Sequence, residues 1–331
     1  RAVGVLGFHT MNGETFLLGA KAVILASGGC GLKSIYIGHR NLTGDSQAMA
    51  LREGAHLRSL EQTSSNTVSR EHDIHGLNLF VGSGGKFINA TGEEFMWHYH
   101  PVLGSRARQS DLVVGFSREV SEGRGPICLD MRSVSPKDRE LMRKVLPETF
   151  MLWDRAGIDP FAAPIEWIPA FRLKMGAGGG VHVDTRCRTN LEALFAVGDV
   201  CCAPQHGTYT IGGMNLAFAA VSGVRSGDFA ADLALQSSAH SLEAETAQVA
   251  EKVAALFVPT ERPKGPSADE VITKLQRIII RHPVTYLRSA GTLKAALSDL
   301  LDLGGEIDAV KAKDSHDLVK AHELRNMALL A

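Results

Sequence analysis

Short apolar stretches that close on glycine predict buried strands at two distant places in the chain. Residues 194–199, Leu-Phe-Ala-Val-Gly-Asp, are apolar up to the final Gly-Asp pair. Residues 21–29, Lys-Ala-Val-Ile-Leu-Ala-Ser-Gly-Gly, are uncharged after the lysine and end in two glycines. Before them, apolar residues at 2–8 and 15–18 flank Asn12-Gly13, a pair typical of hairpin turns. The pattern predicts a hairpin that leads into one buried strand, and a second buried strand far along the chain.

Helical spacing predicts helices at 46–55, at 214–235, and from residue 268 onward with a further helix near 293–301. In the second of these, small residues recur at helical spacing: Ala217, Ala220, Gly223 and Gly227. Core packing is the simpler explanation of this stripe, and close approach to a cofactor is the alternative. Residues 236–265 are polar with several prolines, which is typical of a linker.

The chemistry suggested by these elements is nucleotide or flavin binding. A strand that ends in Gly-Asp, followed by a glycine-bearing turn into a helix, brings backbone N–H groups and one carboxylate against a ribose-phosphate chain or a flavin. Asp199 would accept hydrogen bonds from hydroxyl groups, and Asn215 and Leu216 would lie at the positive end of the helix. Taken alone, the same residues also fit an ordinary strand, loop and helix.

Six motifs in a fixed order decide between these interpretations. They are Ala26-Ser-Gly-Gly29, Thr43-Gly-Asp45, Gly92-Glu-Glu-Phe-Met96, Arg124-Gly-Pro-Ile-Cys-Leu-Asp130, residues 194–199, and a His-Gly…Gly-Gly segment at 206–213. In this order the chain resembles the flavoprotein subunits of the fumarate reductase and succinate dehydrogenase family, which includes L-aspartate oxidase and adenylylsulfate reductase.

The resemblance implies a noncovalently bound FAD. The residues expected to contact it are Ala26, Ser27, Gly28, Gly29, Thr43, Gly44, Asp45, Asp199, Asn215 and Leu216.

The resemblance also implies the fold class and its division. The expected class is α/β (α+β), with an FAD-binding Rossmann-like domain lacking its N-terminal part, an inserted capping domain and a C-terminal helical segment. The corresponding ranges are 1–62 and 165–235 for the FAD-binding domain, 63–164 for the capping domain, 236–265 for a linker and 266–331 for the helical domain.

The family's Gly-x-Gly-x-x-Gly fingerprint, which cradles the FAD pyrophosphate, does not occur before the hairpin of this sequence. The family's terminal Glu-Ser-Arg-Gly-x-His segment does not follow the last helix either. We therefore expect the chain to be incomplete relative to the family at both ends, with the pyrophosphate loop supplied by a partner subunit or by the remainder of a longer chain.

The substrate site departs from the family pattern at three positions. Glu94 stands where the family has the arginine of Gly-Glu-Arg-Phe-Met, Arg172 replaces a substrate-binding histidine, and Thr210 replaces a substrate-binding arginine. A glutamate in place of an arginine would repel a dianion. We assign as catalytic candidates Arg172, with Lys174 beside it, for an anionic small-molecule substrate, His206 as a proton donor and Glu94 as a general base. A purely structural or surface role is the alternative for each.

These features predict an FAD-dependent oxidoreductase subunit whose substrate site differs from the dicarboxylate pattern. The alternative is a catalytically inactive flavin-binding protein with a structural or assembly role. A bound flavin whose yellow colour is bleached by the substrate would indicate that the protein is an active enzyme.

The composition limits the cellular compartment and the classes of binding partner that we expect for this protein. The 331 residues carry a formal net charge of −1, which gives no basis for binding nucleic acid. No apolar run is long enough to cross a bilayer. The five cysteines form no Cys-x-x-Cys pair, which favours reduced thiols in the cytoplasm. His98 and His100 are two residues apart and do not share a helical face, so we assign no metal site to them.

Overall fold

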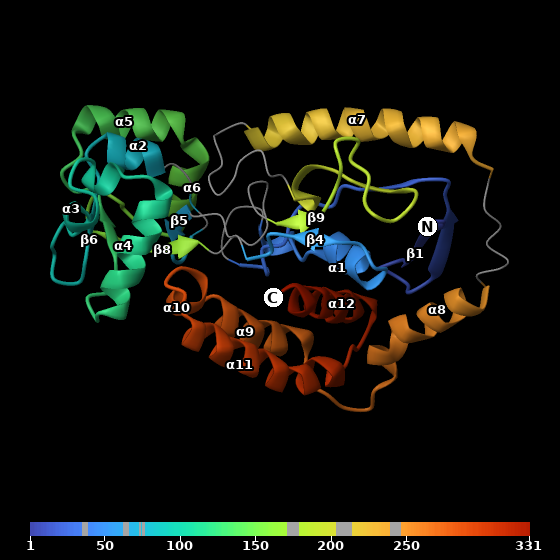
Figure 1. Cartoon of the computed structure of the whole chain (residues 1–331). Helices are drawn as coiled ribbons and strands as arrows, with labels where there is room; N and C mark the ends of the chain where they lie inside the picture. Colours follow the sequence, from blue (N-terminus) through green and yellow to red (C-terminus); the bar gives the residue numbers. More distant parts are fainter. Residues whose placement is uncertain are drawn as a thin grey trace.

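The computed structural model describes residues 1–34, 39–61, 66–72, 74, 77–170, 179–202, 214–238 and 246–331. The chain has a mixed α/β fold. Figure 1 shows a lobe containing β5–β8 and α2–α6 on the left and a central region with α1, β4 and β9, which α7 crosses on one side. The helices α9, α11 and α12 lie on the opposite side of that central region.

The chain begins with the predicted hairpin. β1 (Gly4–Phe8) and β2 (Thr15–Gly19) pair antiparallel, with Gly4 opposite Gly19. Gly13 in the connecting turn has a φ of 75°, a conformation that glycine adopts without steric cost. The hairpin is confirmed, but its loop runs over residues 9–14, and only Gly13 of the Asn-Gly pair has a positive φ, so it is not the two-residue turn typical of that pair.

Both predicted strands are present, and they are neighbours. β3 (Val23–Leu25) pairs in parallel with β10 (Leu194–Ala196), with Val23 opposite Leu194. Only β10 is buried as predicted, whereas β3 is partly exposed, with Ile24 40% exposed. The short helix η3 (Gly198–Val200) follows β10, and α7 (Met214–Gln236) packs over the pair. The Gly198 N–H donates to Ser222 Oγ at 3.1 Å, which ties α7 to the end of β10.

The helix α1 (Asp45–Arg52) covers nearly the residue range predicted for it. β4 (Leu57–Arg58) follows and pairs antiparallel with β9 (Gly180–Val181). A small apolar cluster joins these elements, made of Ala50, Ala55, Val181, Ala196, Val200 and Cys201. We call it the sheet core.

The lobe on the left of Figure 1 contains a four-stranded antiparallel sheet in the order β5–β8–β7–β6. Its strands are β5 (Asn66–Ser69), β6 (Lys86–Ile88), β7 (Cys128–Asp130) and β8 (Ile165–Ala170). Its helices are α2 (Leu77–Gly82), α3 (Met96–Tyr99), η2 (Gly104–Arg106), α4 (Gln109–Ser121), α5 (Pro136–Val145) and α6 (Pro147–Arg155). β8 falls in the range assigned from sequence to the flavin domain, yet it pairs with two strands of this lobe.

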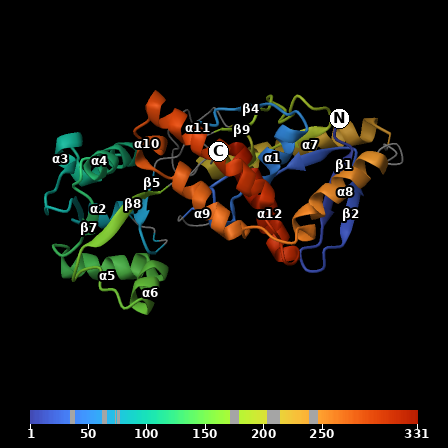
Figure 2. The same cartoon turned by 90° about the horizontal axis from the view of Figure 1, so that it is seen from below.

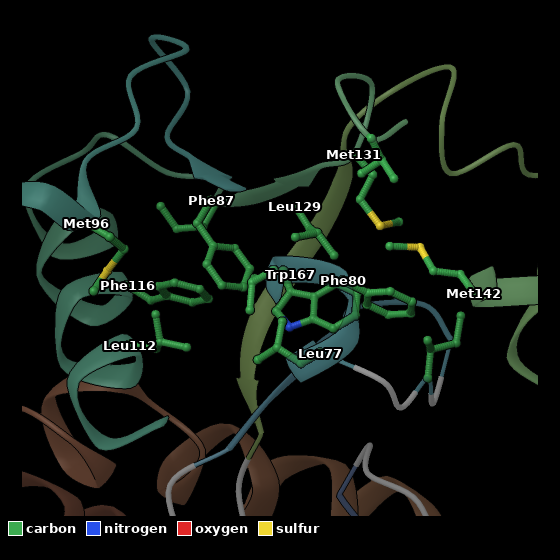
Figure 3. Close-up of a cluster of buried hydrophobic side chains, with 14 of the residues drawn as sticks. Leu77, Phe80, Phe87, Met96, Leu112, Phe116, Leu129, Met131, Met142 and Trp167 are labelled. Atoms are coloured by element: carbon green, nitrogen blue, oxygen red, sulfur yellow. The ribbon is translucent and has the colours of Figure 1, made fainter. Parts of the chain in front are cut away.

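Large aromatic side chains fill the centre of this lobe. Figure 3 shows Phe80, Phe87, Phe116 and Trp167 converging between the sheet and its helices. The rings of Phe87 and Phe116 meet edge to face with centroids 4.7 Å apart. Trp167 is 1% exposed, and its indole N–H donates to Thr67 Oγ1 at 3.0 Å, so its one polar atom is satisfied. We call this cluster the lobe core.

The remainder of the chain is helical, as predicted from residue 268 onward. The helices are α8 (Thr246–Glu261), α9 (Ala268–Ile279), α10 (His282–Thr285), α11 (Ala290–Ala309) and α12 (Ser315–Leu330). Val271, Leu275 and Ile279 face inward from α9 and, with residues of α11 and α12, form what we call the helical core. The range predicted as a linker contains α8, and Pro259 lies inside that helix.

Figure 2 shows α12 beside α1, with α8 running along the hairpin. No helix within the described parts of the chain combines the length and the apolar character needed to cross a bilayer.

Candidate cofactor site

The two glycine-ended strands leave the same edge of the sheet. Because β3 and β10 run parallel, residues 26–29 and residues 197–199 emerge side by side. The Val197 N–H donates to the Leu25 carbonyl at 3.0 Å, so the pairing continues past the last residue of β10. The structure thus brings together the ends of two strands that are far apart in the sequence, and the predicted contacts Ser27, Gly28, Gly29 and Asp199 follow these ends.

The turn after β3 is built on a glycine and held by a buried amide. Gly28 has a φ of 81°, in the left-handed region that favours glycine. Its carbonyl accepts a 2.9 Å hydrogen bond from Gln47 Nε2. Gln47 is fully buried on α1, and its Oε1 has no hydrogen-bond partner among the described residues. Sequence reasoning missed Gln47, although it follows the Thr43-Gly-Asp45 motif by only two residues.

Thr43, Gly44 and Asp45 have well-defined partners within the protein. Thr43 forms a β-bridge with Cys30 and donates from Oγ1 to Asp45 Oδ2 at 2.7 Å. Asp45 Oδ1 accepts from Asn326 Nδ2 at 2.6 Å. Both oxygens of the Asp45 carboxylate therefore have protein donors, and one of them comes from α12. These contacts give the motif a structural role beside the cofactor role predicted for it.

Asn326 also accepts from Arg52 Nη1 at 2.6 Å, so one buried amide joins an acid and a base on α1. Burial lowers the pKa of Arg52, and the nearby Arg325 lowers it further. The sequence gives little indication of Asn326, because its partners lie more than 270 residues away.

The predicted contacts on the other strand occupy the expected elements. Asp199 lies in η3 and is half-buried. Asn215 and Leu216 lie in the first turn of α7, where N–H groups are not used within the helix. Asn215 is half-buried, and its Oδ1 has no hydrogen-bond partner in the part of the chain that the structure describes. The Leu216 side chain is 77% exposed, so only its backbone is placed for a contact.

A neutral thiol lies beneath this edge. Cys201 Sγ donates to the Gly198 carbonyl at 3.2 Å. Burial raises the pKa of the Cys201 thiol to about 12, with smaller contributions from Cys187 and Cys202. At neutral pH this thiol stays protonated, so it packs as a small apolar group and is a poor nucleophile.

Of the catalytic candidates, the structure describes only Glu94. Arg172 and His206, with Lys174 and Thr210, lie outside the described residues. Glu94 lies in the loop before α3, and its Oε2 is 3.9 Å from Lys86 Nζ. Both views show α3 at the outer end of the lobe, away from α1. Within the described ranges, His, Cys, Asp and Glu form no group of three suited to a metal ion.

Comparison with known protein families matches residues 1–216 of the sequence to a family described as FAD binding domain. The chain belongs to this family. The match covers both glycine-ended strands, and the family resemblance expected from the six motifs is confirmed.

Relatives agree with the match. The chain is 29% identical over 338 residues to an uncharacterized FAD-dependent oxidoreductase of Methanocaldococcus jannaschii, covering 100% of this chain and 60% of that protein. It is 29% identical over 343 residues to one of the subunits of fumarate reductase (CoM/CoB) from Methanothermobacter marburgensis, covering 99% of this chain and 60% of the relative. The chain therefore spans about three-fifths of the length of these relatives.

Solved structures share the fold. Sdh1 of Mycobacterium smegmatis, in complex with UQ1, superimposes with a TM-score of 0.85 at 24% identity, covering 99% of this chain and 56% of Sdh1.

Proposed function

We propose that this chain forms the flavin-holding part of an FAD-dependent oxidoreductase related to the fumarate reductase and succinate dehydrogenase flavoproteins. The observation that carries the proposal is the parallel pairing of β3 with β10, whose carboxyl ends share one sheet edge and are followed in the sequence by Gly28-Gly29 and Gly198-Asp199. Ligands of open α/β sheets bind beyond the carboxyl ends of the strands, where this edge lies. Its residues come from the range that matches the FAD binding domain.

The residues at this edge fit a flavin dinucleotide. The backbone N–H groups of Gly28 and Gly29 and the first turn of α7 would donate to phosphate or flavin oxygens. The Asp199 carboxylate would accept from ribose or ribityl hydroxyls. Within the described ranges, Gln47 and Asn215 each keep a side-chain oxygen without a partner. When bound, FAD would supply hydride acceptance and donation, and the chain's contribution is to hold and orient it.

An open strand edge supports a contribution from outside these residues. Val23 and Leu25 bond toward β10, so the N–H and C=O of Ile24 point to the opposite edge of β3. Among the described residues no strand pairs with that edge, and the Ile24 side chain is 40% exposed. We infer that a strand bearing the Gly-rich pyrophosphate loop pairs there, from a partner subunit or from further residues of a longer chain.

The outer face of α7 supports the same inference. A Cβ atom added at Gly223 or Gly227 would meet nothing within 4 Å, so the small-residue stripe faces away from the rest of the described chain. Val221 and Val224 on the same helix are 58% and 69% exposed. A strand on the β3 edge, followed by a helix against this stripe, would cover both surfaces.

The finer parts of the proposal concern attachment and substrate. We propose that the flavin is noncovalent, which predicts its release into the supernatant on acid precipitation. We also propose that the substrate is an anion other than fumarate, because Arg172, Thr210 and Glu94 differ from the dicarboxylate pattern. Glu94 already has Lys86 as a charged neighbour, which supports a structural role as much as a catalytic one. Fumarate that oxidises the reduced protein rapidly would contradict this substrate proposal.

The test of flavin binding is a titration with FAD followed by flavin fluorescence, with and without the polypeptide that supplies the pyrophosphate loop. We expect weak binding by these residues alone and tight binding with the loop. Asp199→Asn should weaken the tight complex about tenfold or more, because it removes a charged acceptor. Asp154→Asn, on an exposed ion pair of the lobe, is the matched control. Equal affinity of the Asp199→Asn variant and the wild type would contradict the assigned site.

A further inference from the structure

Residues 30–34 continue the chain directly after Gly28-Gly29, at the edge proposed to hold the flavin, and part of their backbone is strained. Leu32 and Lys33 have φ values of 50° and 52°, in the left-handed region. Residues with a branched or long side chain are disfavoured there, and two in succession are more unusual than one. Such a conformation persists only where surrounding contacts impose it. Here these contacts come from α9 and α12.

One side-chain amide of α9 binds both carbonyls of the strained pair. Gln276 donates from Nε2 to the Leu32 carbonyl at 2.7 Å and to the Lys33 carbonyl at 3.2 Å. The direction of a carbonyl follows from the backbone dihedral angles on either side of its peptide plane. Two carbonyls that share one donor are therefore restricted in direction, and the left-handed conformation is restricted with them.

An ion pair holds the same two residues from α12. Lys33 Nζ lies 2.6 Å from Glu323 Oε2, and the two side chains are 25% and 17% exposed. Leu32 is fully buried and belongs to the helical core. Because α9 and α12 pack against each other, they hold residues 30–34 from one common support.

The turn at Gly28 is connected to the same support by a second route. Asn326 of α12 donates to Asp45 at the start of α1, and Gln47 of α1 donates to the Gly28 carbonyl. The chain after β3 is thus held by α1 at the turn and by α9 and α12 a few residues later. Contacts from elements far along the sequence determine the course of the chain at the candidate cofactor site.

We propose that Gln276 and Glu323 are positioning residues for the flavin. They hold Leu32 and Lys33 in the left-handed conformation, and so keep the Gly28-Gly29 turn ready for the cofactor. Without these contacts the strained pair would relax to negative φ values, and the cost of ordering the turn on binding would lower the affinity. This inference rests on the proposed function, because it assigns two further residues to the same site.

The experiment measures FAD affinity and the visible circular dichroism of the bound flavin, in the protein combined with the polypeptide that supplies the pyrophosphate loop. Glu323→Gln removes a charge, and Gln276→Met keeps a similar length without an N–H group. Each should weaken FAD binding about tenfold and change the circular dichroism of the flavin. A loss of global stability alone would leave the spectrum of the bound flavin unchanged.

Two rescue variants separate positioning from a general loss of structure. Gln276→Lys keeps a donor and should retain most of the affinity. Lys33→Glu and Glu323→Lys should each weaken binding, because each places like charges together, and the double variant should recover most of the affinity and the wild-type flavin spectrum.

The matched control is Asp269→Asn. It breaks a 2.6 Å ion pair between Lys320 of α12 and Asp269 of α9, which does not involve residues 30–34, and it should bind FAD normally. Far-ultraviolet circular dichroism would verify that each variant is folded.

The outcomes distinguish this inference from the proposed function. Full affinity and an unchanged flavin spectrum in folded Glu323→Gln and Gln276→Met protein would overturn the inference. If Asp199→Asn still weakened binding in that experiment, the proposed function would stand. Equal weakening by Asp269→Asn, or no recovery in the double variant, would also overturn the inference. Absence of flavin binding by the wild-type complex would overturn both.

Discussion

At the scale of single residues, Gly44 shows how one motif position serves the packing of distant elements. It has a φ of 74° and precedes α1. A Cβ atom there would overlap Leu330 Cδ1 of α12 and lie 2.9 Å from Cys30 Cβ. The glycine therefore allows the start of α1, the chain after β3 and the end of α12 to meet. The sequence motif predicted a cofactor contact, and the structure adds a packing requirement.

We predict that Gly44→Ala destabilises the protein more than Gly54→Ala does. Both glycines have positive φ values, 74° and 90°, so each substitution carries a backbone cost of about 1–2 kcal/mol. A Cβ at Gly54 would meet no described atom within 4 Å, whereas at Gly44 it would overlap two side chains. Overpacking adds about 1–3 kcal/mol at Gly44 alone. Urea unfolding of the two variants measures the difference, and equal losses would show that the contacts around Gly44 give way freely.

At the scale of elements, Glu119 of α4 joins three segments of the lobe. Its side chain is 3% exposed and accepts hydrogen bonds from Arg124 at 2.8 and 2.7 Å. It also accepts from Asn89, which follows β6, at 3.0 Å and from Tyr99 of α3 at 2.7 Å. These donors, led by Arg124, lower the pKa of Glu119 to about 2. Burial and the Glu119 carboxylate raise the pKa of Tyr99 to about 12.

We predict that this network stabilises the lobe in a pH-dependent way. The pKa of Glu119 is lower in the folded protein than its ordinary value of 4.5, so its stabilisation is complete above that value and is lost as the pH falls toward 2. At neutral pH this shift adds on the order of 3 kcal/mol to the free energy of unfolding. Glu119→Gln should therefore be much less stable than the wild type at pH 6, with the gap narrowing at pH 3.

The matched control is Glu122→Gln. Glu122 pairs with the same Arg124 but is 54% exposed, so its loss should cost less than about 1 kcal/mol. Urea unfolding at the two pH values measures both variants. A gap for Glu119→Gln that is as wide at pH 3 as at pH 6 would contradict the assignment.

Elements with a local signal could be predicted from sequence, and long-range pairings could not. The hairpin, the two glycine-ended strands and the helices from residue 268 follow from periodicity and turn residues. The apolar pattern of β8 does not say which strands it joins, so sequence alone assigns it to the flavin domain. The linker assignment of 236–265 rests on polar residues and prolines, whereas this range contains the helix α8. Gln47 and Asn326 give no signal in the sequence because only their tertiary partners give them meaning.

At the scale of the whole molecule, the apolar interior is divided. The lobe core is built from β5–β8 and α2–α6, and the helical core from residues of α1, α9, α11 and α12 with the chain after β3. The two regions meet where α10 approaches α4, and His282 Nδ1 lies 2.8 Å from Ser117 Oγ. Separate clusters joined by a small contact favour separate cooperative units.

We predict that core substitutions in the two regions act independently on local stability. Phe116→Ala should cost about 3–5 kcal/mol in the lobe core, and Leu275→Ala about 2–5 kcal/mol in the helical core. Both side chains are fully buried, which makes them a matched pair. In native-state hydrogen exchange, Phe116→Ala should lower protection in α4 and β7 and leave α9 and α12 unchanged, and Leu275→Ala should do the reverse. If either variant lowered protection equally in both regions, the chain would unfold as one unit, and the contact between α10 and α4 would be stronger than its size indicates.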